Sequence, residues 1–284
     1  MLYPQSNAHR QMTDLSGFWD FLTDPEANGD SSTGFDGGPP VAVPASWNDQ
    51  ITELRDYLGI AWYQTRFHLP WGWENKRIFL RFGSVNYRAE VWLNTVKLGE
   101  HEGGHLPFEF EVTGHWLRPG ENLLVVRVDG DLAPDRVPPG NIPPDPKNPF
   151  TSFMRNHPAS AFDFFPFCGI HRPVLLYAVS PQAIMDITVT TEIDGSQGTV
   201  RVQVERPTET TARVSLRGHG TTIEETFTGA ETTLLVDDAA LWSPDAPNLY
   251  DLIVELLADN DVVDRYTLSI GIRTIAVKGD QLLL

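Results

Sequence analysis

The stretch Leu106-Pro107-Phe108-Glu109-Phe110-Glu111-Val112-Thr113 alternates apolar and acidic side chains with a period of two. In an extended strand, this period places Phe108, Phe110 and Val112 on one face and both glutamates on the other. Such alternation is typical of an antiparallel sheet that buries one face against a core and leaves the other in water. The stretch therefore predicts a strand of a β-sandwich.

The segments around this stretch repeat the same pattern. Turn-forming residues occupy 118–122, and Leu124, Val126 and Val128 follow as a predicted return strand. Shorter alternating runs lie upstream, at 15–22, 41–44, 61–69, 78–82 and 89–93. No run of ten or more residues has the 3.6-residue period of a helix. We therefore expect an all-β fold, and interpret residues 1–180 as one domain.

The composition of the chain changes near Ser180-Pro181. Seven of the eight tryptophans and fourteen of the fifteen phenylalanines precede this point. After it, β-branched residues alternate in about seven short runs within roughly 100 residues, which is typical of an immunoglobulin-like sandwich. We expect such a sandwich over residues 181–275. The terminal leucines that follow predict one arm of a hairpin whose partner strand is missing from the chain.

Overall charge and cysteine content restrict the function. A formal charge of −17 over 284 residues disfavours nucleic acid and anionic membranes, which attract clustered Lys and Arg. Cys168 is the only cysteine, so an intrachain disulfide is excluded and a reducing compartment fits. The start of the chain has no leader pattern, and no run approaches 18 apolar residues. We therefore expect a cytoplasmic location without membrane contact. Glycine-rich nucleotide-binding motifs are absent from the sequence, so no cofactor is expected.

His101-Glu102-Gly103-Gly104-His105 matches the H-E-x-x-H pattern of zinc proteases. That pattern binds zinc because residues i and i+4 share one face of a helix. Here two internal glycines would cost a helix about 2 kcal/mol relative to alanine, and predicted strands flank the motif on both sides. The favoured interpretation is a Gly-Gly turn between strands, with no metal.

Asp163 is the candidate site residue. It is a single carboxylate among four phenylalanines, in the segment Phe162-Asp163-Phe164-Phe165-Pro166-Phe167. Eight of the thirty residues at 131–160 are proline, which predicts a long loop leading into this segment. Loops of this kind often hold recognition residues. Two roles stay open from the residues alone: Asp163 binds a ligand, or it caps a turn or pairs with Arg172.

Five tryptophans offer a second candidate for ligand binding. Flat indole rings can stack on the apolar faces of sugars, and they also fill cores. The sequence leaves both roles open, with core packing favoured, for Trp47, Trp62, Trp71, Trp73 and Trp92.

With these residues in view, the chain resembles the N-terminal half of glycoside hydrolase family 2, and within it the glucuronidase branch. The similarity is carried by 15–21, 43–50, 62–64, 81–85, 91–94, 101–109, 163–165 with 169–172, 241–244 with 249–250, and 271–273. The aromatic run after Asp163 fits the glucuronidases better than the galactosidases. The resemblance implies a jelly-roll, galactose-binding-like sugar-binding domain and an immunoglobulin-like domain. A (β/α)8 barrel with two catalytic glutamates would follow.

In this interpretation residues 276–284 begin the barrel, neither catalytic glutamate lies in the chain, and the chain is inactive alone. The resemblance implies that Asp163 contacts the sugar of a β-D-glucuronide in the complete enzyme, which could be a homo-oligomer. Three alternatives stay open. The chain is a standalone carbohydrate-binding module, or it belongs to another family 2 glycosidase such as a β-galactosidase. Otherwise, it associates with a separately encoded barrel.

Overall fold

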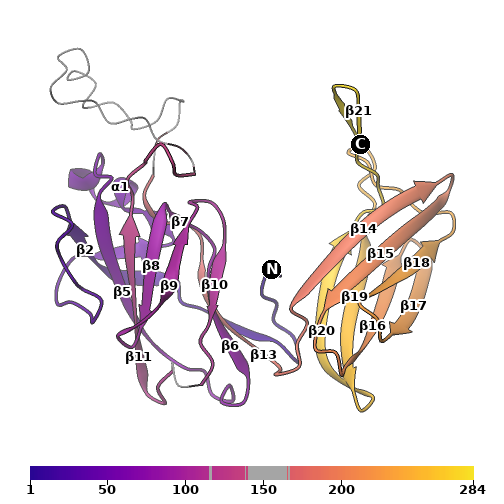
Figure 1. Cartoon of the computed structure of the whole chain (residues 1–284), viewed down its shortest axis with the longest axis horizontal. Coiled ribbons are helices and arrows are strands. Elements are labelled where there is room, and N and C mark those ends of the chain that lie inside the picture. The colour runs from indigo at the N-terminus through magenta and orange to yellow at the C-terminus, as the bar shows by residue number, and fades with distance from the viewer. Residues whose placement is uncertain (115–116, 138, 140–164, 166) are drawn as a thin grey trace. The chain divides into compact units, whose positions relative to one another are not determined.

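A computed structural model describes residues 1–114, 117–137, 139, 165 and 167–284 (Figure 1). The described residues form two compact units. One unit is Met12–Ala178, and the other combines Met1–Gln11 with Val179–Leu284. The boundaries drawn from composition remain predictions about domains, and they did not indicate that the first residues join the second unit. Among the described residues, no helix is long and apolar enough to cross a membrane.

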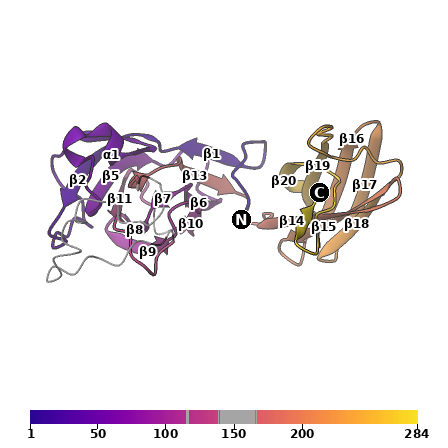
Figure 2. The same cartoon turned by 90° about the horizontal axis from the view of Figure 1, so that it is seen from above.

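The first unit is a sandwich of antiparallel strands (Figure 2). One sheet has the order β1 (Gln11–Asp14), β13 (Val174–Val179), β6 (Arg77–Phe82), β10 (Phe108–Glu111). The other has the order β3 (Pro40–Val43), β2 (Gly17–Asp24), β5 (Ile60–His68), β11 (Glu121–Asp129), β8 (Arg88–Leu93), β9 (Val96–Glu102). A small third sheet has the order β4 (Ala45–Ser46), β12 (Gly169–Ile170), β7 (Val85–Asn86). Between β4 and β5 lie the short helix α1 (Trp47–Gln50) and the 3-10 turn η1 (Thr52–Leu54).

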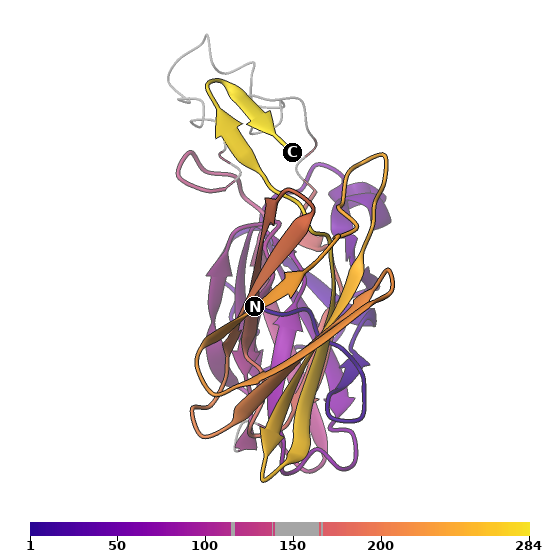
Figure 3. The ribbon, with the colours of Figure 1, turned by 90° about the vertical axis from the view of Figure 1, so that its right-hand side faces the viewer.

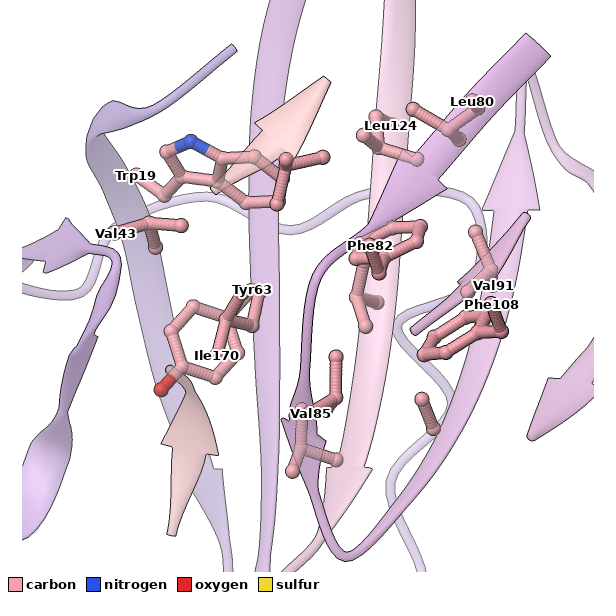
Figure 4. Close-up of a cluster of buried hydrophobic side chains, with 14 of the residues drawn as sticks. Trp19, Val43, Tyr63, Leu80, Phe82, Val85, Val91, Phe108, Leu124 and Ile170 are labelled. Atoms are coloured by element: carbon pink, nitrogen blue, oxygen red, sulfur yellow. The ribbon is translucent and has the colours of Figure 1, made fainter. Parts of the chain in front are cut away.

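Aromatic and aliphatic side chains from both large sheets meet in one core (Figure 4). Trp19 from β2, Tyr63 from β5 and Phe82 from β6 are at most 1 % exposed. Alternation decides which side faces inward, since Trp19 is buried while the preceding Phe18 is 79 % exposed. The strands predicted from a period of two are confirmed in this unit.

The pairing of β10 differs from the prediction. Phe108 and Val112 are buried in the core as expected, whereas Glu109 and Glu111 pair with arginines of β6. However, β11 is not the hairpin partner of β10, because β10 pairs with β6 while β11 pairs with β5 and β8. Residues 118–122 therefore connect the two sheets instead of closing a hairpin. A period of two in the sequence predicts which face of a strand is buried, but it does not predict which strand lies next to it.

The second unit is a sandwich of a three-stranded and a four-stranded sheet, visible as two layers in Figure 2. The first sheet has the order β14 (Asp186–Asp194), β15 (Gln197–Glu205), β18 (Glu231–Val236). The second has the order β17 (Thr221–Phe227), β16 (Thr211–Gly218), β19 (Tyr250–Ala258), β20 (Asp261–Ile270). The predicted immunoglobulin-like sandwich is confirmed.

The terminal hairpin corrects the sequence prediction. β21 (Ala276–Lys278) pairs with β22 (Gln281–Leu283) across a turn in which Gly279 has φ +64° (Figure 3). Both arms therefore lie in the chain, and the prediction of a missing partner strand was wrong. Glycine adopts this backbone conformation without strain, so the turn closes within the last nine residues. Leu282 remains 74 % exposed.

A buried ion pair attaches the N-terminal residues to the second unit. The Arg10 guanidinium donates to both carboxylate oxygens of Asp264, at 2.8 and 2.6 Å. It also donates to the Ile184 carbonyl at 2.6 Å, and the Ile184 amide donates to Asp264 at 2.7 Å. Two-pronged contacts of this kind satisfy most of the hydrogen-bonding capacity of both groups, as burial of charge requires.

Candidate functional site

The candidate site lies at the end of the first unit that holds residues 167–171, which follow the Asp163 segment in the sequence. Strand β12 lies between β4 and β7, with Gly169 opposite both Ser46 and Asn86. Gly169 has φ +122°, and a Cβ there would lie 2.8 Å from the Tyr63 hydroxyl. Glycine is therefore required for this close approach. Asp163 itself lies outside the described residues, so its two alternative roles remain predictions.

Asn48 is the hub of this end of the sandwich. Its side-chain oxygen accepts the Cys168 backbone amide at 2.8 Å. Its side-chain nitrogen lies 3.0, 3.0 and 2.9 Å from the carbonyls of Leu54, Arg55 and Tyr57. The residue is 2 % exposed. One carboxamide thus joins α1, the turn that follows it and the segment preceding β12.

A second amide anchors the same segment from the opposite side. The Asn86 side chain donates to the Phe167 carbonyl at 2.9 Å. The neighbouring Ser84 hydroxyl donates to the Gly104 carbonyl at 2.5 Å, and the Ser84 carbonyl accepts the His171 amide at 3.0 Å. Side chains on both sides therefore fix the backbone at residues 167–171.

His101 and Glu102 of the motif end strand β9, and Gly103 and Gly104 lie in the connection to β10, as the sequence predicted. β9 ends at Glu102 and β10 begins at Phe108, so the two histidines of the motif do not share a helical face. A Cβ on Gly104 would lie 2.6 Å from the Tyr87 ring, and the His101 ring stacks on Phe108 at 4.4 Å. Among the described residues, no group of three His, Cys, Asp or Glu could hold a metal ion.

Burial sets the ionisation of the groups around the anchored segment. It lowers the pKa of His171, an effect reinforced by His105 and opposed by Asp49 and nearby backbone carbonyls. Burial likewise lowers the pKa of His101. The pKa of the buried Cys168 thiol is raised by burial and by the negative charges of Asp131 and Asp129. The thiol is therefore protonated at neutral pH and is not an activated nucleophile.

Aromatic rings lie on the described flank of the Asp163 segment. The rings of Phe165 and Phe167 are 4.7 Å apart, and the Arg55 guanidinium lies 5.7 Å from the centre of the Phe165 ring. The Arg172 guanidinium contacts the His105 carbonyl at 3.4 Å. Phe165 and Phe167 therefore lie in a partly cationic environment on this part of the sandwich.

The five tryptophans separate into buried and exposed groups. Trp47, Trp62 and Trp73 are at most 3 % exposed, so core packing is their role. Trp92 is half-buried against Trp62, with ring centres 5.5 Å apart. Trp71 is 95 % exposed but lies in the loop that precedes β6, at the other end of that strand from Ser84. The tryptophans therefore do not form one sugar-binding platform.

Sequence reasoning assigned no role to Asn48 or Asn86, although both organise the site. A local signal exists for Asn48, because Ser46 caps α1 and accepts the Asn48 amide at 3.1 Å. Asn86 has no such signal, since its partner is 81 residues away in the sequence.

Comparison with known proteins gives two family matches that together span most of the chain. Residues 12–180 match the sugar binding domain of glycosyl hydrolases family 2, and residues 182–273 match the family model named glycosyl hydrolases family 2.

Individual relatives match over the whole chain. A β-glucuronidase of Paenibacillus borealis is 37 % identical over 294 residues, covering 100 % of this chain and 49 % of the relative. That of Sus scrofa is 36 % identical over 317 residues, covering 100 % of this chain and 48 % of the relative. A structure of Ruminococcus gnavus β-glucuronidase in complex with uronic isofagomine has a TM-score of 0.87 at 32 % identity, covering 99 % of this chain and 48 % of that one. The chain spans about half the length of these relatives.

We expect Asn48→Ala to destabilise the first unit by at least about 1–3 kcal/mol, because it leaves the buried Cys168 amide without its acceptor and removes one donor from the Leu54, Arg55 and Tyr57 carbonyls. Urea unfolding followed by tryptophan fluorescence measures this, since seven of the eight tryptophans precede residue 180. The exposed Asn75 provides the control, and Asn75→Ala should change little. Equal unfolding midpoints for the two variants would contradict the role given to Asn48.

Low pH should reduce the free energy of unfolding of the first unit. Because burial lowers the pKa of His101 and His171, the unfolded chain binds more protons than the folded chain below about pH 6.5. The contribution of the two neutral histidines to the free energy of unfolding is complete above that pH. It is lost as the pH falls through their pKa values in the folded chain, which burial lowers. We expect the urea midpoint to fall between about pH 7.5 and about pH 5.5, and to fall less in His171→Gln. The exposed His68 gives the control variant His68→Gln, which should behave as the wild type. An unchanged pH dependence in His171→Gln would refute this assignment.

Proposed function

This chain belongs to glycosyl hydrolases family 2, and from that premise we propose that it supplies the sugar-binding and immunoglobulin-like domains of a retaining β-glucuronidase. The observation that carries the proposal is the similarity to β-glucuronidases over 100 % of the chain, across both sandwiches. The substrate class is then a β-D-glucuronide, and the complete enzyme hydrolyses its O-glycosyl bond. We extend the proposal to a cytoplasmic enzyme that forms a homo-oligomer.

The proposed division of labour assigns the chemistry to a (β/α)8 barrel outside these residues. Retaining glycosidases use two carboxyl groups about 5–5.5 Å apart, one as nucleophile and one as acid and base. The Cys168 thiol of the described site is buried with a raised pKa, so it does not suggest covalent catalysis by this chain. In this proposal the chain supports the barrel and helps to form the sugar site.

Asp163 is the residue proposed to reach the substrate. It lies four residues before Phe167 in the sequence, and the Phe167 carbonyl is held by Asn86 at 2.9 Å. The next residue, Cys168, is held by Asn48. A fixed end of this kind would limit the positions open to the preceding carboxylate, which favours its use as a hydrogen-bond acceptor for a sugar hydroxyl. Such a charged acceptor contributes about 1.5–3 kcal/mol.

We expect the 284-residue chain to release no 4-nitrophenol from 4-nitrophenyl β-D-glucuronide, because both catalytic glutamates would lie in the barrel. Isothermal titration calorimetry with glucuronate should also show no binding, since a supporting domain completes a sugar site only together with the barrel. Turnover by the purified chain that is lost in Asp163→Ala would refute the proposal. Binding of glucuronate without turnover would instead favour a standalone carbohydrate-binding module.

A further inference from the structure

A pocket of about 550 Å³ opens along one side of the second unit. It lies between β14 and β20, the edge strands of the two sheets, which Figure 2 shows on the same side of the sandwich. Its lining includes Val189, Thr191, Trp242, Leu249, Ile270 and Arg273. The volume falls within the range of small-molecule sites, which is about 300–1,000 Å³.

The N-terminal residues leave this part of β20 uncovered. Gln5 pairs through its side chain with the backbone of Thr267, at 2.6 and 3.1 Å, and Asn7 donates to the Arg265 carbonyl at 3.0 Å. These contacts occupy the edge of β20 before the pocket. Gln5 and Asn7 therefore contact β20 at residues 265 and 267, and the pocket begins further along the strand, at Ser269.

Trp242 and Arg273 are held in the pocket by their backbones. The Thr191 hydroxyl donates to the Arg273 carbonyl at 2.6 Å and accepts its amide at 3.3 Å, while the Trp242 amide donates to the Ile272 carbonyl at 2.9 Å. A Cβ on Gly271 would lie 2.7 Å from Trp242, so the indole packs directly on the glycine. Both residues therefore line the pocket with their backbones fixed.

The guanidinium of Arg273 lies 4.6 Å from the centre of the Trp242 ring. The arginine is exposed, and no ion pair joins it to a carboxylate among the described residues, whereas Arg213 and Arg265 of the same unit both pair with Glu255. A guanidinium that stacks on an indole uses its flat face for this contact. Its N–H groups point outward in its own plane, where they can donate to a carboxylate. The site is therefore suited to an anion.

The remaining walls are mainly apolar. Leu249 is 50 % exposed and Ile275 is 59 % exposed, and Val189 and Ile270 contribute further aliphatic surface. Hydroxyl groups are already engaged in part, because Thr191 bonds to the Arg273 backbone and Ser269 contacts Asp251 at 3.4 Å. This leaves few partners for a ligand with many hydroxyl groups, so a sugar fits the lining poorly.

We propose that this pocket binds an amphipathic carboxylate, an apolar ring system carrying one carboxylate group. The ring would lie against Trp242 and the aliphatic walls, and the carboxylate would accept hydrogen bonds from Arg273. All the lining residues belong to the second unit, and the proposal does not depend on the proposed glycosidase activity.

The probe is 2-naphthoate, titrated into the full chain by calorimetry and by NMR of the tryptophan indole N–H signals. We expect saturable binding that shifts the Trp242 signal, with at least about tenfold weaker affinity for the neutral 2-naphthamide. Arg273→Gln should weaken 2-naphthoate to the same degree. The matched control is Arg201→Gln, an exposed arginine on β15 of the same unit, which should leave the affinity unchanged.

Three results would overturn the proposal. These are no binding of 2-naphthoate up to roughly 10 mM, equal affinities for 2-naphthoate and 2-naphthamide, or equal affinity for wild type and Arg273→Gln. The amide comparison uses the wild-type chain, so it holds even if a variant folds poorly. Displacement of 2-naphthoate by glucuronate at equal concentration would contradict the ligand class, because the lining should reject a polar sugar acid.

Discussion

The carboxamide of Asn48 is the contact on which the candidate site depends. A buried backbone amide must find an acceptor, and the Cys168 amide finds it in this side chain instead of in a strand. The same carboxamide holds the residues that follow α1, through three carbonyls. The loop after α1 and the end of the Asp163 segment are therefore held by one group.

This arrangement favours a positioning role for the described part of the site. His101 and His171 are partly buried with lowered pKa values, the Cys168 thiol is buried with a raised pKa, and Asn48 and Asn86 are committed to backbone groups. Such hydrogen-bonded groups fix the geometry of the backbone at residues 167–171. A scaffold of this kind suits the supporting half of a glycosidase, in which the reacting carboxylates belong to a different domain.

Period-two alternation predicted most of the strands and the all-β class, because burial of one sheet face directly constrains the sequence. It could not predict that β10 and β11 lie in different sheets, since pairing depends on the path of the chain and not on the buried face. Nor did it predict that Arg10 joins Asp264, a contact between residues 254 positions apart. The terminal hairpin was misjudged because the short arm 276–278 has little pattern of its own.

For the candidate site, the sequence and the resemblance located the turn at 103–104 and the segment near Cys168, but not the amides that anchor it. The Ser46 cap of α1 is a local signal for Asn48, whereas the Cys168 partner of Asn48 and the Phe167 partner of Asn86 are too distant in the sequence for spacing to reveal these contacts. The role of Asp163 rests on the resemblance, and its placement lies outside the described residues.

The most direct measurement uses a chimeric β-glucuronidase, in which this chain replaces the aligned 49 % of the Paenibacillus borealis enzyme. The kcat/KM of this chimera for 4-nitrophenyl β-D-glucuronide is then compared with the kcat/KM of its Asp163→Ala and Asp56→Ala variants. Asp56 is exposed and provides the control. Loss of a charged hydrogen bond worth about 1.5–3 kcal/mol predicts a roughly 10- to 150-fold fall in kcat/KM for Asp163→Ala alone. A folded chimera that is inactive, or one whose kcat/KM does not change in Asp163→Ala, would contradict the account.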